Sequence, residues 1–462
     1  MALQLPQALI DSLQTATGFD EINFKAVHDC AGQLVSIRIN KSKINSAEEN
    51  IFFKDKLDEK VSWNANGYYL KERPIFTIDP LFHAGAYYVQ EASSMFLQEA
   101  ITQSCDLEKD IHVLDLCAAP GGKSTLIQSV LSEDSLLVSN EVIKSRAGIL
   151  AENITKWGAA NVVVTNNDPK DFKKLPAFFD LIVVDAPCSG SGLFRKDPEA
   201  IREWSLNNVE LCSQRQQRIL ADVFDALKPG GVLIYSTCSY SKEEDESIAD
   251  WLKDNYEVFN IRFQLNDEWG IVETASGKHS CYGYRFYPDK LKGEGFFISA
   301  FRKGSEAAES YKEKKPNISK LLPSKAEVIV AGNYLNRGED FSFLKWQNDM
   351  LAIPTGIFNA TLFLQQHLYI KKAGINMGTI IRDELVPSHE WVLSNAAANV
   401  FPAIEVNKDT ALDYLRRKDI NIETSLRGWA VIKYEGISLG LVKILPNRIN
   451  SYYPKDWRIL NK

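Results

Sequence analysis

The segment HVLDLCAAPGGKST, residues 112–125, is the starting point for predicting the fold of this chain. It predicts a buried strand over residues 112–117, then a tight loop, then the first turn of a helix. Gly121 and Gly122 allow the backbone to approach a ligand closely, and the amide groups of a helix N-terminus face such a ligand. Taken alone, the segment also fits a plain strand-to-helix turn.

Two classes of ligand use a loop of this kind. GGKST resembles the end of a phosphate-binding P-loop, but that motif requires a glycine where Cys117 stands, and Pro120 and the short loop also fit it poorly. The other class is a ligand with a carboxylate, such as S-adenosylmethionine. The loop therefore favours the carboxylate ligand over a nucleotide phosphate.

Apolar runs of the same kind continue from residue 106 to residue 303. HVLDLC, SLLVSN, NVVVTNN, DLIVVDAP and GVLIYSTCS are short, do not alternate, and are bounded by Gly, Pro, Asp or Asn, which is typical of strands buried on both faces of a parallel sheet. Helical segments such as SRAGILAENITKWG and VELCSQRQQRILADVFDAL lie between them. We therefore predict an α/β fold with a doubly wound, Rossmann-like domain over residues 106–303, closed by a late strand in GEGFFISAFRK.

Three further regions flank this domain. Residues 1–105 combine a helical start with the strand-like LVSIRIN, and we expect an α+β RNA-binding extension there. Residues 304–325 are polar, charged and interrupted by two prolines, which indicates a linker. Residues 326–462 end in short strands with glycine turns, so we expect a mostly β module at the end of that region.

Composition limits the classes of protein to consider. No apolar run is long enough to span a membrane, and the N-terminus lacks the basic start of a signal peptide. The seven cysteines are scattered and form no C-x-x-C pair, which indicates a reducing compartment and argues against a disulfide framework or a zinc knuckle. The net charge of −7 gives no sign of nucleic acid binding, which would therefore need a local basic surface.

Acidic residues stand at the ends of the next two predicted strands. Glu141 lies 26 residues after Asp115, at the strand end where a ribose diol is gripped, although a solvated glutamate is the alternative. Asp168 closes VVVTNND and could reach an adenine amine, or could serve only as a turn residue. Together with the glycine loop they favour a nucleoside-bearing cofactor, and the lack of a phosphate loop favours S-adenosylmethionine over a dinucleotide.

Two cysteines lie at the ends of neighbouring predicted strands. One strand ends in Asp185-Ala-Pro-Cys188 and the next in Ser-Thr-Cys238-Ser, so the two thiols are expected to lie close together, beside the reactive end of the cofactor. A lone cysteine is usually a small core residue, and this interpretation is preferred for the cysteines at 30, 105, 212 and 281. A thiolate at a strand end could instead act as a nucleophile.

Paired thiols with an aspartate fit cytosine methylation. Carbon 5 of cytosine is a poor nucleophile until a thiolate adds to carbon 6, and Asp185 could hydrogen-bond the ring and supply a proton during that addition. A second cysteine has a plausible task when the carbon 5 proton leaves and the thiolate is eliminated. Hydrolysis would call for a histidine partner, and none of the six histidines lies in these loops.

The motifs resemble those of one family. DLCAAPGGKST, DAPCSGSGLFRKDPEA and YSTCSYSKEEDE are similar to the motifs of the Sun/nucleolar-protein family of RNA cytosine carbon-5 methyltransferases, over roughly residues 30–303. The resemblance implies that Cys238 is the nucleophile and that Cys188 assists product release, a ranking that spacing alone does not provide. It also implies that Lys123 lies near the target base, and we expect Asp185 at the Watson–Crick edge of that base.

The resemblance also implies a set of cofactor contacts. The residues expected to contact S-adenosylmethionine are Cys117, Ala118, Ala119, Pro120, Gly121, Gly122, Lys123, Glu141, Arg146, Asp168 and Asp185. The block RKDPEA, residues 195–200, and Gln216 match the pattern as well. They would shape the RNA side of the site, or serve only as helix-cap and surface groups.

The C-terminal tail carries a second resemblance. PSHEWVLSN and GWAVIKYEGISLGLVKILPNRINSYYPKDWRI are similar to the PUA-like region of RsmF-type enzymes, which modify small-subunit ribosomal RNA. Basic and aromatic residues are interleaved there, as suits structured RNA, although a terminal strand with a solvated face is the alternative. The residues are Lys443, Arg448, Tyr452, Tyr453, Lys455, Trp457, Arg458 and Lys462.

The sequence therefore predicts a cytoplasmic, S-adenosylmethionine-dependent RNA cytosine carbon-5 methyltransferase that acts on small-subunit (16S) ribosomal RNA. We expect a monomer without a metal site. The alternatives are a transfer-RNA methyltransferase of the same family, a P-loop nucleotide hydrolase and a non-catalytic RNA-binding protein.

Overall fold

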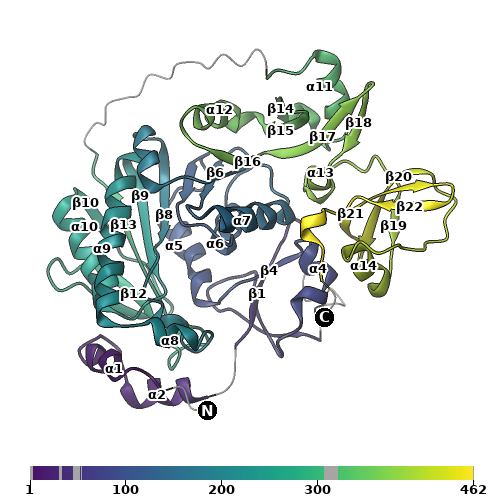
Figure 1. Ribbon diagram of the computed structural model, residues 1–462. Helices are drawn as coiled ribbons and strands as arrows, with labels where there is room; N and C mark the ends of the chain where they lie inside the picture. Colours follow the sequence, from purple (N-terminus) through teal and green to yellow (C-terminus); the bar gives the residue numbers. More distant parts are fainter. Residues whose placement is uncertain (1–3, 31–33, 45–52, 54, 306–320, 461–462) are drawn as a thin grey trace.

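A central ten-stranded sheet forms the middle of the molecule (Figure 1). The computed structural model of the chain describes residues 4–30, 34–44, 53, 55–305 and 321–460. Five parallel strands, in the order β7-β6-β5-β8-β9, form the core of the sheet. Their bounds are β5 (His112–Asp115), β6 (Leu136–Asn140), β7 (Val162–Thr165), β8 (Phe179–Asp185) and β9 (Leu227–Thr237). Chain order reverses at β5, which confirms the predicted doubly wound, Rossmann-like domain.

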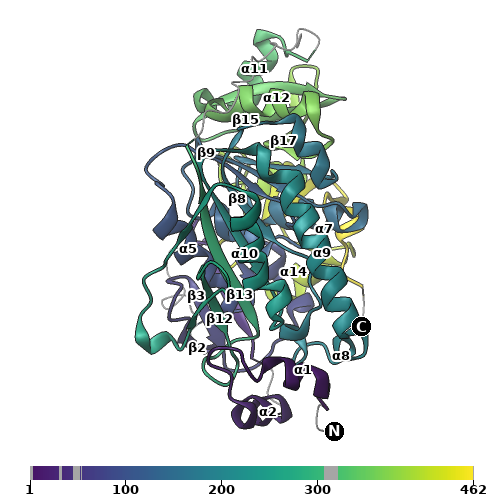
Figure 2. The ribbon, with the colours of Figure 1, turned by 90° about the vertical axis from the view of Figure 1, so that its left-hand side faces the viewer.

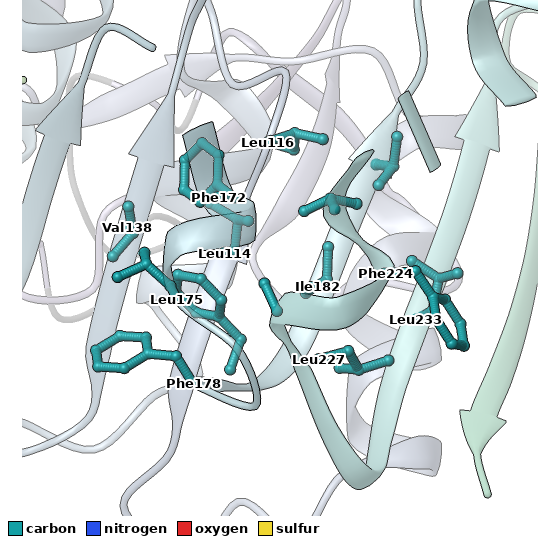
Figure 3. Packing of buried hydrophobic residues seen from close by; sticks show 14 of the residues in the cluster. Leu114, Leu116, Val138, Phe172, Leu175, Phe178, Ile182, Phe224, Leu227 and Leu233 are labelled. Carbon is teal, nitrogen blue, oxygen red and sulfur yellow. The ribbon is translucent and has the colours of Figure 1, made fainter. Parts of the chain in front are cut away.

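Alternate residues of these strands face opposite layers of helices. Leu114 and Val138 belong to one buried cluster, and Val113 and Leu137 belong to the other. Figure 3 shows Phe172 on the side of Leu114 and Val138. Both faces are buried, so the strands are apolar throughout. The first face is covered by η3 (Pro169–Lys174), α9 (Leu206–Val223), η5 (Phe224–Ala226) and α10 (Glu246–Asn255), and the second by α5 (Leu97–Ser104), α6 (Gly122–Gln128) and α7 (Lys144–Trp157).

Local sequence explains where these helices begin and end. The Ser205 side chain accepts a hydrogen bond of 3.1 Å from the Asn208 amide and so caps α9, an interaction that typically contributes about 1 kcal/mol. Gly158 adopts a φ of 91°, a left-handed conformation that favours glycine, and α7 ends there. The segment KPGG comes after α9 and η5 and lies in the first part of β9.

Antiparallel strands extend the sheet at both edges. The predicted late strand is β13 (Phe296–Lys303), which pairs with β9 and carries β12 (Tyr282–Phe286) and β10 (Val258–Ile261). β11 (Val272–Ala275) follows β12. At the opposite edge, β16 (Ile370–Ala373) from the C-terminal region pairs with β7. No sequence pattern indicated this last pairing.

The N-terminal region contains a second sheet, in the order β2-β3-β1-β4. Its strands are β1 (Ser36–Ile39), β2 (Leu57–Lys60), β3 (Gly67–Leu70) and β4 (Tyr87–Val89), with η1 (Phe76–Ile78), α4 (Pro80–His83) and η2 (Ser93–Phe96). Two helices, α1 (Gln7–Leu13) and α2 (Glu21–Asp29), lie beside α8 (Glu199–Glu203), as Figure 2 shows. Leu9 and Phe24 from these helices pack with Trp204 and Tyr240, so the N-terminal helices adjoin the segment that follows Cys238.

The C-terminal region begins with a four-stranded sheet, in the order β14-β15-β17-β18. It contains α11 (Lys325–Gly332), η8 (Gly338–Asp340), β14 (Phe341–Trp346), β15 (Asp349–Pro354), η9 (Thr355–Ile357), α12 (Phe358–His367), β17 (Ile375–Ile381), β18 (Glu384–Pro387) and α13 (His389–Leu393). Most of the predicted linker, residues 306–320, lies outside the described residues. Ser324 and Glu327 form a capping box that starts α11.

The last sheet, in the order β19-β20-β21-β22, completes the chain. Its elements are β19 (Ala403–Glu405), α14 (Lys408–Leu415), β20 (Gly428–Tyr434), β21 (Ile437–Leu445), β22 (Arg448–Ser451) and η10 (Lys455–Trp457). Tyr414 and Val442 share one buried cluster with Ile37 and Tyr87, so this sheet packs against the N-terminal sheet (Figure 1). Over the described ranges, no helix is long and apolar enough to cross a membrane.

Candidate active site

The candidate site lies at the carboxyl ends of the parallel strands. β5, β6, β7, β8 and β9 run in the same direction, so the loops that follow them meet at one edge of the sheet. Chain order reverses at β5, and open α/β sheets bind their ligands beside such a reversal. The glycine loop follows β5, and the two cysteine loops follow β8 and β9.

The glycine loop has the backbone that the sequence predicted. Gly121 has a φ of 117° and is the N-cap of α6, and a Cβ atom on Gly122 would lie 3.3 Å from a ring carbon of Tyr88. Arg38 on β1 is fully buried beneath this turn and donates a hydrogen bond of 2.6 Å to Thr125 Oγ1. The N-terminal sheet therefore supports the loop, a role for Arg38 that no sequence motif indicated.

Asp115 supplies an unsatisfied acceptor at the start of the same loop. The carboxylate is fully buried, and its Oδ2 accepts a hydrogen bond of 2.6 Å from Ser124. Its Oδ1 is buried without a hydrogen-bond partner among the described residues. Burial raises the pKa of Asp115 to about 7. An unsatisfied buried acceptor fits a ligand with an N–H donor, such as the amino group of S-adenosylmethionine.

Glu141 and Arg146 connect the second strand to the glycine loop. Glu141 is buried, its Oε1 accepts from the Ile143 amide at 2.9 Å, and its Oε2 lies 3.5 Å from an Arg146 nitrogen. Arg146 Nη2 also donates to the Ala119 carbonyl at 2.7 Å. The structure therefore brings together three of the predicted cofactor residues.

Asp168 lies on a loop that the C-terminal region holds. The side chain is exposed and accepts a hydrogen bond of 3.1 Å from the Lys170 amide at the start of η3. Next to it, Asn167 Nδ2 donates to the Tyr369 carbonyl at 3.1 Å, and the Tyr369 amide donates to Asn167 Oδ1 at 2.9 Å. Asn167 thus clamps the residue that precedes β16, and no sequence signal indicated this contact.

The two candidate cysteines face each other. Cys188 Sγ and Cys238 Sγ are 2.9 Å apart, and both thiols are partly buried. All seven cysteines lie in the described parts of the chain, and each is a free thiol. The hydrogen bond with Cys238, together with burial, raises the pKa of Cys188 well above its usual range. Cys188 therefore keeps its proton at neutral pH and can donate it toward the Cys238 sulfur.

A lysine–aspartate pair lies at the end of β8. Lys123 Nζ is 2.7 Å from Asp185 Oδ2, and Ser236 Oγ donates to Asp185 Oδ1 at 2.9 Å. Lys123 also lies 5.4 Å above the ring of Phe296. Burial favours a neutral Lys123, but the charge and hydrogen bond of Asp185 outweigh it and raise the pKa of the lysine. Lys123 therefore carries a proton at neutral pH.

The block RKDPEA and Gln216 make contacts within the protein. Arg195 Nη1 lies 3.7 Å from Glu294 Oε2, and Asp197 accepts from the Glu199 amide at the start of α8. Gln216 is fully buried on α9 and donates to the Pro187 carbonyl at 3.1 Å. Gln216 therefore braces the loop that carries Cys188, whereas these contacts of Arg195 and Asp197 are made to Glu294 and to the start of α8.

The aromatic tail differs from the prediction. Tyr453 is only 1% exposed and packs 5.5 Å from Tyr414, so its expected place on an RNA-binding surface is wrong. The periodic pattern concealed this, because a tyrosine can fill a core position as readily as a surface one. Tyr452 is 39% exposed, its ring is 4.4 Å from Trp429, and Lys443 lies 5.2 Å above Trp429. A basic and aromatic surface therefore exists around Tyr452.

The remaining residues of the tail complete this surface only in part. Trp457 is partly buried, with its ring 5.3 Å from that of His389. Arg448, Lys455 and Arg458 are exposed, and Lys462 lies outside the described residues. Among the residues with described positions, no three His, Cys, Asp or Glu side chains gather in a way that could hold a metal ion.

Three known families match separate parts of the chain. Residues 103–302 match the family described as 16S rRNA methyltransferase RsmB/F. Residues 5–92 match the N-terminal domain of 16S rRNA methyltransferase RsmF, and residues 401–459 match the methyltransferase RsmF PUA domain. The matches therefore include both cysteine loops and both flanking regions.

Relatives are similar over most of the chain. The chain is 30% identical over 435 residues to the ribosomal RNA small subunit methyltransferase F of Aeromonas salmonicida, and the match covers 91% of this chain and 90% of that protein. It is 31% identical over 440 residues to the protein of the same name from Aliivibrio fischeri, again covering 91% and 90%. The crystal structure of a methyltransferase homolog protein from Pyrococcus horikoshii is similar with a TM-score of 0.52 and 27% identity, covering 65% of this chain and 100% of that chain.

Proposed function

We propose a catalytic mechanism from one premise: the chain belongs to the RsmF family of ribosomal RNA small subunit methyltransferases. Membership decides against a P-loop nucleotide hydrolase and against a non-catalytic RNA-binding protein. We propose that the chain methylates carbon 5 of a cytosine in 16S ribosomal RNA through a covalent adduct with Cys238. The observation that carries this proposal is the pair of sulfurs 2.9 Å apart, beside the Lys123–Asp185 ion pair.

S-adenosylmethionine is the proposed methyl donor. The open turn at Gly121 and the unsatisfied Asp115 Oδ1 fit its methionine portion, and Glu141 and Asp168 stand at the strand ends where the ribose and adenine would lie. Arg146 fixes Glu141 relative to the glycine loop. When bound, S-adenosylmethionine supplies an electrophilic methyl group on a sulfonium sulfur.

Cys238 is the proposed nucleophile. A flipped-out cytosine would lie between the two cysteine loops, and the Cys238 sulfur would form a bond to carbon 6. The electron pair of the carbon 5–carbon 6 double bond then makes carbon 5 nucleophilic. The ring nitrogen gains negative charge as this bond forms, and the protonated Lys123, held by Asp185, is placed to offer it a proton or a hydrogen bond.

Cys188 is proposed to act in release. After methylation, carbon 5 loses its proton to a water molecule, the double bond re-forms, the bond between carbon 6 and the Cys238 sulfur breaks, and the ring nitrogen returns any proton it took to Lys123. The raised pKa keeps Cys188 a thiol, and its sulfur lies 2.9 Å from the Cys238 sulfur, within reach for donating its proton. A hydrogen-bond donor at that distance stabilises the departing thiolate. The free enzyme then returns to its starting state.

The RNA target follows from the regions outside the methyltransferase sheet. The relatives that match 91% of the chain are named ribosomal RNA small subunit methyltransferases, which favours 16S ribosomal RNA over transfer RNA. The Tyr452–Trp429–Lys443 surface lies in the region that matches a PUA domain and offers the stacking and positive charge that structured RNA requires. A ribosomal RNA substrate and seven free thiols fit the reducing environment of the cytoplasm.

Bisulfite sequencing tests the reaction and the target together. Ribosomal and transfer RNA would be compared between cells with and without the gene. We expect one or more protected cytosines of 16S ribosomal RNA to lose protection when the gene is removed. A loss confined to transfer RNA would retain the mechanism and contradict the target, and unchanged protection in both RNAs would contradict the reaction.

A further inference from the structure

Glu244 is a buried carboxylate in contact with both cysteine loops. It ends η6 (Lys242–Glu244) and is fully buried. Its Oε1 accepts hydrogen bonds from the Ser189 amide at 2.8 Å and from Gln216 Nε2 at 3.2 Å. Its Oε2 accepts from Ser189 Oγ and from Ser239 Oγ, each at 2.6 Å. A single side chain therefore joins two loops that lie about fifty residues apart in sequence.

The serine partners of Glu244 are the residues next to the two cysteines. Ser189 directly follows Cys188, and Ser239 directly follows Cys238. Both oxygens of Glu244 are occupied by these loops or by Gln216, which itself holds the loop at Pro187. The Tyr235 hydroxyl donates to the Glu244 carbonyl at 2.6 Å and fixes the backbone of Glu244 to β9. The residue after each cysteine is thus hydrogen-bonded to the same carboxylate, that of Glu244.

The energies of these contacts indicate that Glu244 fixes the positions of its partners more than it stabilises the fold. Burial raises the pKa of Glu244, and the hydrogen bonds from Ser189, Ser239 and Gln216 oppose that shift. A buried charge is weak evidence for stability, because desolvation offsets much of what its partners contribute. Four converging hydrogen bonds do, however, fix the relative position of the groups that donate them.

We propose that Glu244 is a positioning residue that holds the sulfurs of Cys188 and Cys238 within contact distance. The proposal rests on the function proposed above, in which these two thiols react. Direct contacts also link the loops: the Gly192 amide donates to the Cys238 carbonyl at 2.9 Å, and the Ser189 and Ser239 hydroxyls lie 3.5 Å apart. Without Glu244, the loops keep these links and lose the three shorter hydrogen bonds by which its carboxylate joins Ser189 to Ser239.

Two substitutions of Glu244 distinguish the effect of losing its charge from the effect of losing its hydrogen bonds. In Glu244→Gln, the amide oxygen can still accept from the Ser189 amide and Gln216, and the amide nitrogen can donate to the two serine hydroxyls. In Glu244→Ala, all four contacts disappear. We expect Glu244→Ala to lower kcat by about 100-fold with little change in the KM for S-adenosylmethionine, and Glu244→Gln to remain within a few-fold of the original kcat.

The matched control is Glu243→Ala. Glu243 is the preceding residue, its side chain is exposed, and only its backbone carbonyl contacts α9, where it accepts from Ser213. This substitution removes the same type of side chain without touching either cysteine loop. It should leave kcat unchanged.

A trivalent arsenical measures the distance between the thiols without using methyl transfer. Phenylarsine oxide forms two As–S bonds with a pair of adjacent thiols, and its oxygen leaves with the two thiol protons as water. We expect the unmodified chain and Glu244→Gln to capture one equivalent at this pair, identified by its loss in Cys188→Ala. Capture by Glu244→Ala should be at least about tenfold weaker. This readout does not depend on which thiol attacks cytosine.

The outcomes are distinct. If Glu244→Ala captures the arsenical as tightly as the original chain and keeps its kcat, the positioning role is wrong. If Glu244→Gln fails as severely as Glu244→Ala, charge and not shape is what matters, and the proposal is again overturned. If Glu244→Ala does not fold, Ser189→Ala and Ser239→Ala each remove one hydroxyl contact and should each weaken capture. Retained turnover in Cys238→Ala, with arsenical capture still dependent on Glu244, would contradict the reaction mechanism and leave the positioning role supported.

Discussion

Cys188 Sγ and Cys238 Sγ lie 2.9 Å apart because two adjacent parallel strands end in register. Asp185 is the last residue of β8 and pairs with Ser236 of β9. Each cysteine follows within three residues of that pair, so both loops leave the sheet side by side. The sheet brings the two thiols together, and the loop contacts set their final separation.

Removal of the proposed nucleophile should abolish methylation. In Cys238→Ala no covalent bond to carbon 6 can form, so carbon 5 remains a poor nucleophile and product formation should fall by more than about 1,000-fold. The measurement is transfer of a radiolabelled methyl group to 16S ribosomal RNA. Cys30→Ala, which removes an exposed thiol beyond the end of α2, is the control and should retain activity. Substantial turnover in Cys238→Ala would exclude a covalent mechanism at this residue.

Removal of the second thiol should instead trap the RNA. In Cys188→Ala the Cys238 sulfur loses the hydrogen-bond donor that lies 2.9 Å away, so elimination of Cys238 from carbon 6 should slow more than its addition. A protein–RNA adduct that survives denaturing electrophoresis is the expected result. The double variant lacking both thiols should give no such adduct. If Cys188→Ala alone also gave no protein–RNA adduct, a role for Cys188 in release would be contradicted.

Neutralising Asp185 should change the protonation of Lys123. Burial lowers the pKa of this lysine, and the Asp185 charge together with its 2.7 Å contact raises it. In Asp185→Asn burial is no longer compensated, so the pKa of Lys123 should fall, and kcat should decrease by about 100-fold or more. The pH dependence of Lys123 labelling by acetic anhydride, followed by mass spectrometry, measures the shift. An unchanged labelling profile would show that the ion pair does not control this lysine.

The contact between Asn167 and Tyr369 should influence cofactor binding. Asn167→Ala removes two hydrogen bonds, of 2.9 and 3.1 Å, that hold the loop before Asp168 to the C-terminal region. With each hydrogen bond contributing about 1 kcal/mol, the Kd for S-adenosylmethionine should rise by about fivefold or more. Isothermal titration calorimetry provides the measurement. Asn376→Ala, which removes a side-chain contact to Asp349 and leaves both Asn167 contacts in place, should leave the Kd unchanged.

His389 should make the chain sensitive to acid. Both ring nitrogens are buried and lack hydrogen-bond partners among the described residues, and burial lowers the pKa of His389 to about 3. The unfolded chain binds a proton here below pH 6.5 and the folded chain does not, so stability is present above that pH and decreases as pH falls toward 3. Between pH 7 and pH 5, the free energy of unfolding should therefore fall by on the order of 1 kcal/mol less in His389→Phe than in the original chain. Thermal unfolding at both pH values measures this, and equal losses in both proteins would show that another group dominates.

Local sequence accounts for most of the parallel sheet and for the composition of the site. The apolar runs that form β5, β6 and β8 are buried on both faces. Strands in that environment are apolar at nearly every position, so they can be recognised in the sequence. The glycine loop and the two cysteine motifs are contiguous segments, so their residues and strand-end positions are visible without the fold. The residues whose side chains meet there include Lys123 and Asp185, and Cys188 and Cys238.

The sequence alone was enough to predict the five parallel strands, the loop after β5 and the two thiols, because each depends on residues close together in the chain. Only the tertiary structure decided that β16 extends β7, that Arg38 supports the glycine loop, that Tyr453 is buried and that Glu244 joins the cysteine loops. The physical reason is that a strand's partner and a side chain's depth depend on segments far away in sequence. Apolar periodicity specifies the kind of element and its buried face, but not which distant element covers that face.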